Sequence, residues 1–228
     1  MRTAAVLPVK SFARAKQRLS ASVEQRLRAS LAEAMVGDVL AALAASEAID
    51  TTFLVTREQR AAEAAIASGA SVIADDAEAG QSAAAKLGIA RALADGFERV
   101  LCVPGDCPAI DPAELAALLA EHGGAIAEVV VLPDRHGTGT NGLLLAPPDA
   151  IEPSFGPDSC ARHVALAAAA GVACSVQRLP SLTLDVDTGE DLAALRAALA
   201  QIEGRAPMTR ALLAGSDAGL AAAPLAGR

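Results

Sequence analysis

The sequence predicts a single α/β domain with a mostly parallel sheet, and two observations support this class. Short apolar runs, such as TAAVLPV (residues 3–9) and TTFLVT (51–56), alternate with longer segments whose apolar residues recur at helical spacing. Strands that alternate with helices imply parallel pairing through crossover helices. The chain has 228 residues, enough for one sizeable core. We expect residues 1–203 to form the domain, and 204–228, rich in Ala, Gly and Pro, to be a mobile or loosely docked tail in which a helix over 208–214 is conceivable.

Composition and charge favour a small-molecule partner. The net charge is −8 and the chain contains no Trp or Tyr, so the basic face and the stacking side chains typical of nucleic-acid binding are missing. The apolar runs are too short to cross a bilayer, and the N-terminus does not match a signal peptide. We therefore expect a cytoplasmic protein that binds neither nucleic acid nor membrane. The cysteines lack metal-site spacing and are expected to be reduced thiols: Cys102, Cys107, Cys160 and Cys174.

The strand at residues 3–9 is followed by a polar, basic stretch, KSFARAKQRLS. Lys10, Lys16 and Arg18 give it a positive charge in a protein that is acidic overall. Such a loop suits a polyphosphate, which it would hold by charge and by directed hydrogen bonds. A solvated charged loop explains the same pattern, and the residues alone leave both interpretations open.

Helices and strands then alternate. The pattern predicts a helix from Ser20 or Ser22 to about Ala45, a strand at 51–56, a helix ending at Gly69 and a strand at 71–75. The polar connection that follows contains Gly80, Gln81 and Ser82, at the carboxyl end of a strand where ligands often bind. The side chains of Gln81 and Ser82 could bond a base edge or a ribose. A simple helix start capped by Ser82 is the alternative.

The stretch LCVPGDCPAI, residues 101–110, changes character abruptly. A strand over 99–103 stops at a Pro-Gly pair and presents Asp106, and a helix is predicted over 112–121. In open α/β sheets ligands bind beyond the carboxyl ends of the strands, so Asp106 is a candidate for metal or phosphate chemistry. Gly, Pro and Asp are also ordinary turn residues, and a plain turn is the alternative.

The run GTGTNG follows a strand predicted over 125–132. Its small residues would let the backbone approach a ligand closely, and Thr140 and Asn141 offer polar side chains. A hairpin-like turn without any ligand is equally consistent with the pattern.

A helix is predicted to begin near Ser159 and to run to Ala170, before a strand over 172–180. Its first N–H groups and Ser159 could bind an anion, because a helix N-terminus carries partial positive charge. His163 lies about one turn into this helix. We interpret it as a packing or surface residue and assign it no catalytic role.

The segment LTLDVDTGEDL carries the second acidic signal. Asp185 and Asp187 would lie on one face of an extended chain. The residues from Thr188 to Asp191 fit a capping box for the last helix, so Asp187 is left as an exposed acid at a junction of strand and helix. Asp106, Asp187 and the basic loop are the parts that phosphoryl or nucleotidyl transfer with a divalent metal such as Mg²⁺ requires.

Together these motifs resemble the guanylyltransferases of coenzyme F420 biosynthesis, the CofC family. The resemblance rests on LPVKSFARAKQRLS, VPGDCPAI, GTGTNGLLLAP, FGPDSCARH and LDVDTGEDL, which occur in the family's order up to about residue 202. It implies a Rossmann-like nucleotidyltransferase fold, with Mg²⁺ as the cofactor. The implied reaction joins GMP from GTP to a three-carbon phosphoacid and releases pyrophosphate. Phosphoenolpyruvate is the favoured acid, and 2-phospholactate and 3-phosphoglycerate are the alternatives.

The resemblance also implies residue roles. Asp106 and Asp187 would hold Mg²⁺ and, with Lys16, form the catalytic set. Contacts to GTP would come from Lys10, Lys16, Arg18, Gly80, Gln81 and Ser82. Contacts to the acid would come from Thr140, Asn141, Gly156 and Ser159. A transient contact with the next enzyme of the pathway is implied as well. The competing hypotheses are a nucleotidyltransferase for another acceptor, such as molybdopterin or a sugar phosphate, and a catalytically silent nucleotide-binding protein.

Overall fold

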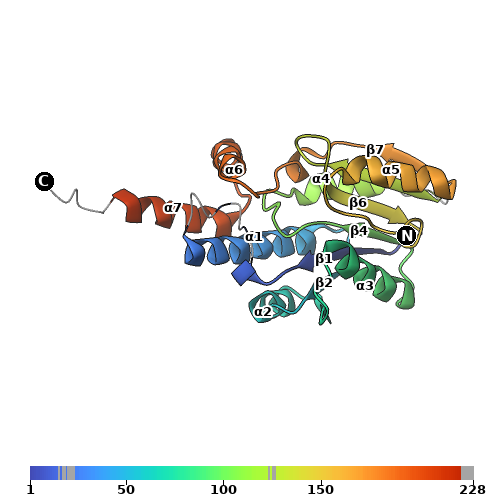
Figure 1. Cartoon of the computed structure of the whole chain (residues 1–228), viewed down its shortest axis with the longest axis horizontal. Helices are drawn as coiled ribbons and strands as arrows, with labels where there is room; N and C mark the ends of the chain where they lie inside the picture. The colour runs from blue at the N-terminus through green and yellow to red at the C-terminus, as the bar shows by residue number, and fades with distance from the viewer. Residues whose placement is uncertain (15, 17–18, 20–23, 123, 125–126, 222–228) are drawn as a thin grey trace, which may run out of the picture.

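The computed structural model of the chain, which describes residues 1–14, 16, 19, 24–122, 124 and 127–221, has the predicted α/β class (Figure 1). Its strands form one seven-stranded sheet in the order β3-β2-β1-β4-β6-β5-β7. The strands are β1 (Thr3–Val9), β2 (Thr51–Thr56), β3 (Ser71–Ala74), β4 (Arg99–Cys102), β5 (Glu128–Pro133), β6 (Thr140–Ala146) and β7 (Ala173–Val176). The mostly parallel sheet predicted from the alternating pattern is confirmed.

One strand runs against the others, and it determines where the cavity described below lies. Strand β6 pairs antiparallel with β4 and with β5, whereas the other pairs are parallel. In the β4–β6 pair, Cys102 lies opposite Leu143. The start of β6 therefore lies beside the carboxyl end of β4. This arrangement brings Thr140 and Asn141 to the same edge of the sheet as Asp106.

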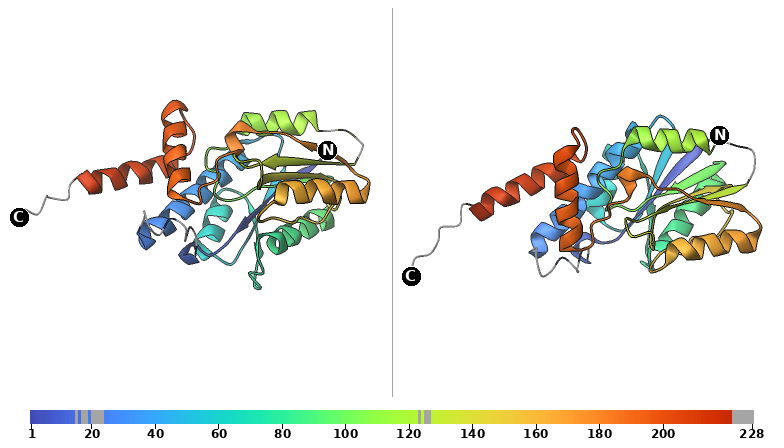
Figure 2. Two further views of the ribbon diagram at one scale, coloured as in Figure 1. Left: turned by 45° about the horizontal axis from the view of Figure 1, so that its top comes forward. Right: turned by 90° about the horizontal axis from the view of Figure 1, so that it is seen from above.

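The helices are α1 (Gln25–Ala45), α2 (Gln59–Ala67), α3 (Gln81–Ala94), α4 (Pro112–Glu121), α5 (Ser159–Ala170), α6 (Gly189–Gln201) and α7 (Pro207–Ala221). Helices α1 to α5 cover the two faces of the sheet, and two further helices lie at one end of the molecule (Figure 2). Successive strand residues point to opposite faces. Leu7 and Leu101 thus pack in a core with α1, α2 and α4, whereas Val6 and Cys102 pack in a second core with α3 and α5.

A third apolar cluster lies at one end of the molecule, where Figure 2 shows α6 and α7. It joins these helices to α1 and to the segments that carry the predicted catalytic residues. Its buried members are Leu19, Leu31, Met35, Ala109, Val186, Leu195, Leu199, Ala206 and Leu213. Helix α7 is longer than the expected 208–214 and is docked at its start. There the Asp38 carboxylate accepts hydrogen bonds from the N–H groups of Met208 (3.0 Å) and Thr209 (2.8 Å).

Some element boundaries differ from the prediction. Helix α1 begins at Gln25, and the serines proposed as its start lie outside the described residues. The strand predicted over 172–180 was too long, because β7 ends at Val176 and a short 3₁₀ helix, η3 (Pro180–Leu182), begins at a proline. The placement of Asp187 at the end of a strand is wrong. It lies in an irregular segment between η3 and α6.

Two expectations about the chemistry of the chain can be compared with the structure. The four cysteines are free thiols: Cys102, Cys107, Cys160 and Cys174. Within the described part of the chain, no helix is both long enough and apolar enough to cross a membrane.

Candidate active site

A cavity of about 620 Å³ opens at the edge of the sheet where β1 and β4 end and β6 begins. The predicted site residues that line it are Lys10, Lys16, Gly80, Gln81, Asp106, Thr140, Asn141, Gly156, Ser159 and Asp187. Arg18 lies outside the described residues. Ser82 is close by but does not line the cavity. The fold therefore gathers at one place residues that are spread over most of the sequence.

A lysine between two carboxylates forms the charged side of the cavity. Lys16 Nζ lies 2.5 Å from Asp106 Oδ2 and 3.2 Å from Asp187 Oδ1. The lysine side chain is only 8% exposed, so the ammonium is shielded from water. Burial alone would lower the pKa of Lys16, but the charges of Asp106 and Asp187 outweigh it and raise that pKa above its ordinary value. The ammonium is thus protonated at neutral pH.

The oxygen atoms of the two aspartates suit a divalent cation. Asp106 Oδ1 is buried and has no hydrogen-bond partner among the described residues. Mg²⁺ is commonly held by one or two carboxylates together with substrate phosphates. No set of three or more His, Cys, Asp and Glu residues in the described ranges is arranged to hold a metal ion. A metal at this pair of carboxylates would therefore need further ligands, such as water or substrate phosphate oxygens, to complete its coordination.

Backbone contacts fix the segment that carries Asp187. The Val186 N–H donates to the carbonyl of Asp106 (3.2 Å), which ties this irregular segment to the loop after β4. The Asp187 N–H donates to Asp191 Oδ2 (3.1 Å), and the predicted capping box between Thr188 and Asp191 is confirmed. Asp191, the N3 residue of this capping box, therefore also orients the backbone of the acid that contacts Lys16.

Asp185 is a polar residue of the cavity for which the sequence predicted no role. Asn141 Nδ2 donates to Asp185 Oδ1 (3.0 Å) and to the carbonyl of Leu182 (2.9 Å). Burial raises the pKa of Asp185; the hydrogen bond from Asn141 opposes this rise, and the charge of Asp106 adds to it. The spacing of two residues from Asp187 was the available signal. It showed that the two acids could share a face but not which partner Asp185 would have.

Neutral side chains around His163 hold a second part of the cavity wall, which we call the uncharged side after them, although the carboxylates of Asp134, Asp158 and Asp185 also line the cavity. Thr140 Oγ1 lies 3.0 Å from Nδ1 of His163, and Nε2 of that ring accepts a hydrogen bond from the Ser154 N–H (2.9 Å). His163 is fully buried, as the packing interpretation expects. Burial, assisted by the charge of Arg162, lowers the pKa of His163 to about 4. The imidazole is therefore neutral at physiological pH.

The loop before α3 forms the third part of the cavity. Gly80 adopts φ 109°, a conformation that side chains rarely allow, directly before Gln81 opens the helix. The Ser82 hydroxyl accepts a hydrogen bond from the N–H of Phe155 (2.9 Å). This contact links the first turn of α3 to the loop before α5. The position of Ser82 favours a role in joining these two segments over direct contact with a base.

A model of the guanylyl transferase CofC-like family matches residues 3–200 of the chain. The chain belongs to the CofC family. It is 49% identical over 213 residues to a protein of Conexibacter woesei named phosphoenolpyruvate guanylyltransferase, covering 93% of this chain and 96% of that relative. It is 36% identical over 193 residues to a protein of Phenylobacterium zucineum named 3-phospho-D-glycerate guanylyltransferase, covering 82% and 86%.

A solved structure of a nucleotidyl transferase from Methanothermobacter shares the fold of this CofC-family chain. Its TM-score is 0.64 at 19% identity, over 88% of this chain and 98% of the other. The sequence-based predictions of a CofC-family guanylyltransferase and of a nucleotidyltransferase fold are therefore confirmed.

Proposed function

We propose that this CofC-family protein transfers GMP from GTP to phosphoenolpyruvate, releases pyrophosphate, and uses Mg²⁺ as its cofactor. The observation that carries the proposal is the buried Lys16 ammonium between Asp106 and Asp187 at the wall of the cavity. Phosphoenolpyruvate is favoured over 3-phosphoglycerate because the relative named for the former is 49% identical and the relative named for the latter 36%.

In the proposed step a phosphate oxygen of phosphoenolpyruvate attacks the α-phosphorus of GTP. The bond from that phosphorus to the oxygen bridging toward the β-phosphorus breaks, and pyrophosphate leaves. The attacking oxygen is already anionic, so no base has to remove a proton from it. Catalysis then rests on positioning and on charge stabilisation.

The charged side of the cavity would serve the triphosphate. Lys10 and Lys16 would bind phosphate oxygens, since both line the cavity and both carry a positive charge at neutral pH. Mg²⁺ held by Asp106 and Asp187 would neutralise the triphosphate and the charge that grows on the leaving pyrophosphate. The backbone at Gly80 and the side chain of Gln81 would contact the guanine nucleoside.

The uncharged side would serve the acid. Thr140, Asn141, Gly156 and Ser159 line the cavity there, and Ser159 is the first residue of α5. The N–H groups of Ser159 and Cys160 already donate to the carbonyls of Gly156 and Thr138, so the start of α5 would favour an anion through the partial positive charge of the helix end and through the Ser159 side chain. We further place the reaction in the cytoplasm and in coenzyme F420 biosynthesis, where the next enzyme would consume the guanylated acid.

The test is to incubate the protein with GTP, Mg²⁺ and one acid at a time, measure pyrophosphate, and determine the product mass. The acids are phosphoenolpyruvate, 2-phospholactate and 3-phosphoglycerate, and ATP and CTP replace GTP in parallel samples. We expect the highest kcat/KM with GTP and phosphoenolpyruvate. If pyrophosphate is released only when molybdopterin or a sugar phosphate is supplied, that compound is the acceptor and not phosphoenolpyruvate. GTP binding without any release would identify a catalytically silent protein.

A further inference from the structure

His163 lies where two parts of the cavity wall meet. It is on α5 and is fully buried, with its ring edge-on to Phe155 at 5.2 Å between centroids. One ring nitrogen contacts the Thr140 hydroxyl at the start of β6, and the other contacts the Ser154 N–H in the loop that leads to Gly156. A single side chain thus connects the strand and the loop that line the uncharged side.

The two contacts determine which ring nitrogen carries the proton. A backbone N–H can only donate, so Nε2 of His163 must be the unprotonated acceptor for Ser154. A neutral imidazole then carries its proton on Nδ1. The Nδ1–H group donates to Thr140 Oγ1 over 3.0 Å.

This contact also determines how the hydroxyl of Thr140 can hydrogen-bond. Because its oxygen accepts from His163, its own proton is available to a different acceptor, and Thr140 lines the cavity. A carboxylate or phosphate oxygen beside this hydroxyl would accept that proton.

We propose that His163 is a positioning residue for the acid substrate: it holds Thr140 as a hydrogen-bond donor toward an anionic oxygen of the acid and anchors the 153–158 loop beside it. This inference rests on the proposed function, because it assigns the uncharged side of the cavity to the acid. A charged ring could still donate to Thr140 but could not accept from Ser154, so the two contacts exist together only in the neutral form.

The first test uses variants that separate the two contacts. In His163→Gln the side-chain oxygen can reach the Ser154 N–H, but the donor to Thr140 is lost. In His163→Asn the amide can donate to Thr140, but it is too short to reach Ser154. We expect His163→Gln and Thr140→Val each to raise KM for phosphoenolpyruvate about tenfold, the effect of one lost hydrogen bond. KM for GTP should change less than about twofold, and His163→Asn and Thr140→Ser should have smaller effects.

The double variant Thr140→Val/His163→Gln provides the decisive comparison. If His163 acts through Thr140, the double variant raises KM for the acid no further than Thr140→Val alone. The inference would be overturned if the effects of the two single substitutions on KM for the acid multiply in the double variant, or if KM for GTP rises equally. It would also be overturned if His163→Asn raises KM for the acid more than His163→Gln does. Melting temperatures of all variants show whether a loss of folding explains a change.

A spectroscopic measurement tests the proton position directly. The chain has three histidines, so ¹⁵N-histidine NMR of the wild type and of His163→Gln identifies the signals of His163. We expect the Nδ1–H tautomer, and an Nε2–H tautomer overturns the inference even if turnover is normal. Wild-type protein that releases no pyrophosphate with any of the three acids contradicts the proposed function and the inference together. Normal wild-type turnover with a failed variant pattern contradicts the inference alone.

Discussion

The charged side of the cavity, around Lys16, and the uncharged side, around His163, hold their side chains by different means. Lys16 is held by the charges of Asp106 and Asp187, which raise its pKa. The ring of His163 is held by two directional hydrogen bonds, and burial lowers its pKa. A reaction centre has to respond to charge that moves between phosphates, whereas a recognition surface has to keep its donors in fixed directions. The contrast supports the proposal that the chemistry takes place on the charged side and that the uncharged side selects the acid.

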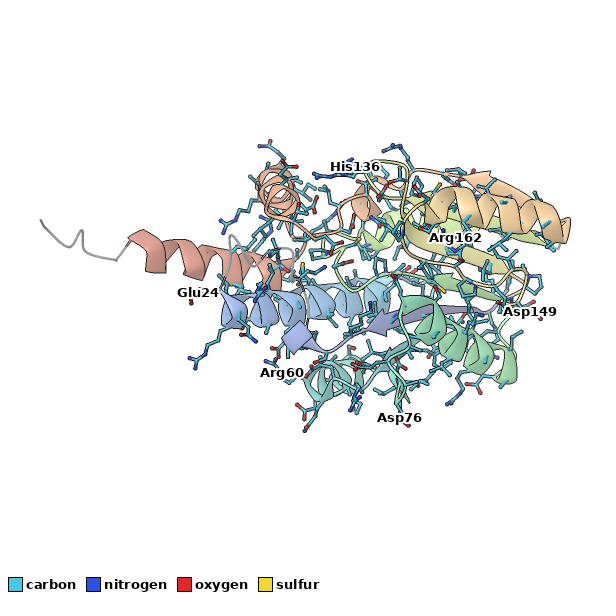
Figure 3. All side chains as sticks on the ribbon, viewed as in Figure 1. Glu24, Arg60, Asp76, His136, Asp149 and Arg162 are labelled. Carbon is cyan, nitrogen blue, oxygen red and sulfur yellow. The ribbon has the colours of Figure 1, made fainter. Side chains whose placement is uncertain are left out.

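The largest effect is expected from the carboxylates. Asp106→Asn and Asp187→Asn should each lower kcat about 10³-fold or more, because each removes a negative charge from the proposed Mg²⁺ site and from Lys16. Pyrophosphate release at saturating substrates measures this loss. Asp149→Asn is the matched control, since Asp149 is exposed and lies at the end of the molecule opposite Glu24 (Figure 3). Near-normal rates in both site variants would show that the charged side of the cavity is not the reaction centre.

Lys16→Met is expected to lower kcat about 100-fold, because it removes a cation that would face the phosphates. It should also change stability at high pH. The folded-state pKa of Lys16 is above the unfolded value, so its stabilising contribution is present below about pH 10.5 and is lost as pH rises through the folded pKa. The free energy of unfolding of the wild type should therefore fall more steeply above about pH 10.5 than that of Lys16→Met. Parallel curves would contradict the charge-based account of this side.

The uncharged side should respond to acid instead. The pKa of His163 is about 4 in the folded protein against 6.5 for an ordinary histidine, so the unfolded chain binds more protons between these values. Stability due to the neutral ring is present above about pH 6.5 and is lost as pH falls toward 4. The wild type should lose up to about 3 kcal/mol across this window relative to His163→Gln. Urea unfolding at several pH values measures the difference, and equal losses in the two proteins would show that His163 is not held neutral.

The smallest effect is expected from a substitution at Asp38, which holds the start of α7 and belongs to neither side of the cavity. Asp38→Asn should lower the free energy of unfolding by about 1 kcal/mol, because an amide has one acceptor oxygen for the N–H groups of Met208 and Thr209. The KM values for GTP and for the acid should stay within about twofold of the wild type. A selective change in either KM would show that the docking of α7 reaches one side of the cavity.

The two sides also differ in how far the sequence predicts them. Asp106 could be found because a buried strand ends at a Pro-Gly pair, and the motifs that resemble the CofC family pointed to Asp187 and Lys16. The meeting of these three residues could not be predicted from local pattern. It depends on the bond from Val186 to Asp106 and on an irregular segment that was expected to be a strand.

The proposed role of His163 could not be predicted from the local sequence for a different reason. A histidine inside a helix looks the same in sequence whether it packs or positions another group. Its partner Thr140 is 23 residues away, and the two meet because β6 runs antiparallel to β4 and starts at the cavity. Polar residues that meet because of the direction of a strand show no characteristic spacing in the sequence. The alternation of strands and helices, in contrast, can be recognised from the sequence pattern.

The docking of α7 has a practical consequence for optical experiments. The chain contains neither Trp nor Tyr, so an introduced tryptophan would be its sole strong ultraviolet fluorophore. Leu212 is half-buried against the third apolar cluster, one residue before the buried Leu213. The indole of a Leu212→Trp variant would thus lie in an apolar environment when α7 is docked and in water when it is not. Its emission wavelength, followed while GTP and the acid are added, would report the state of the C-terminal helix without any attached dye.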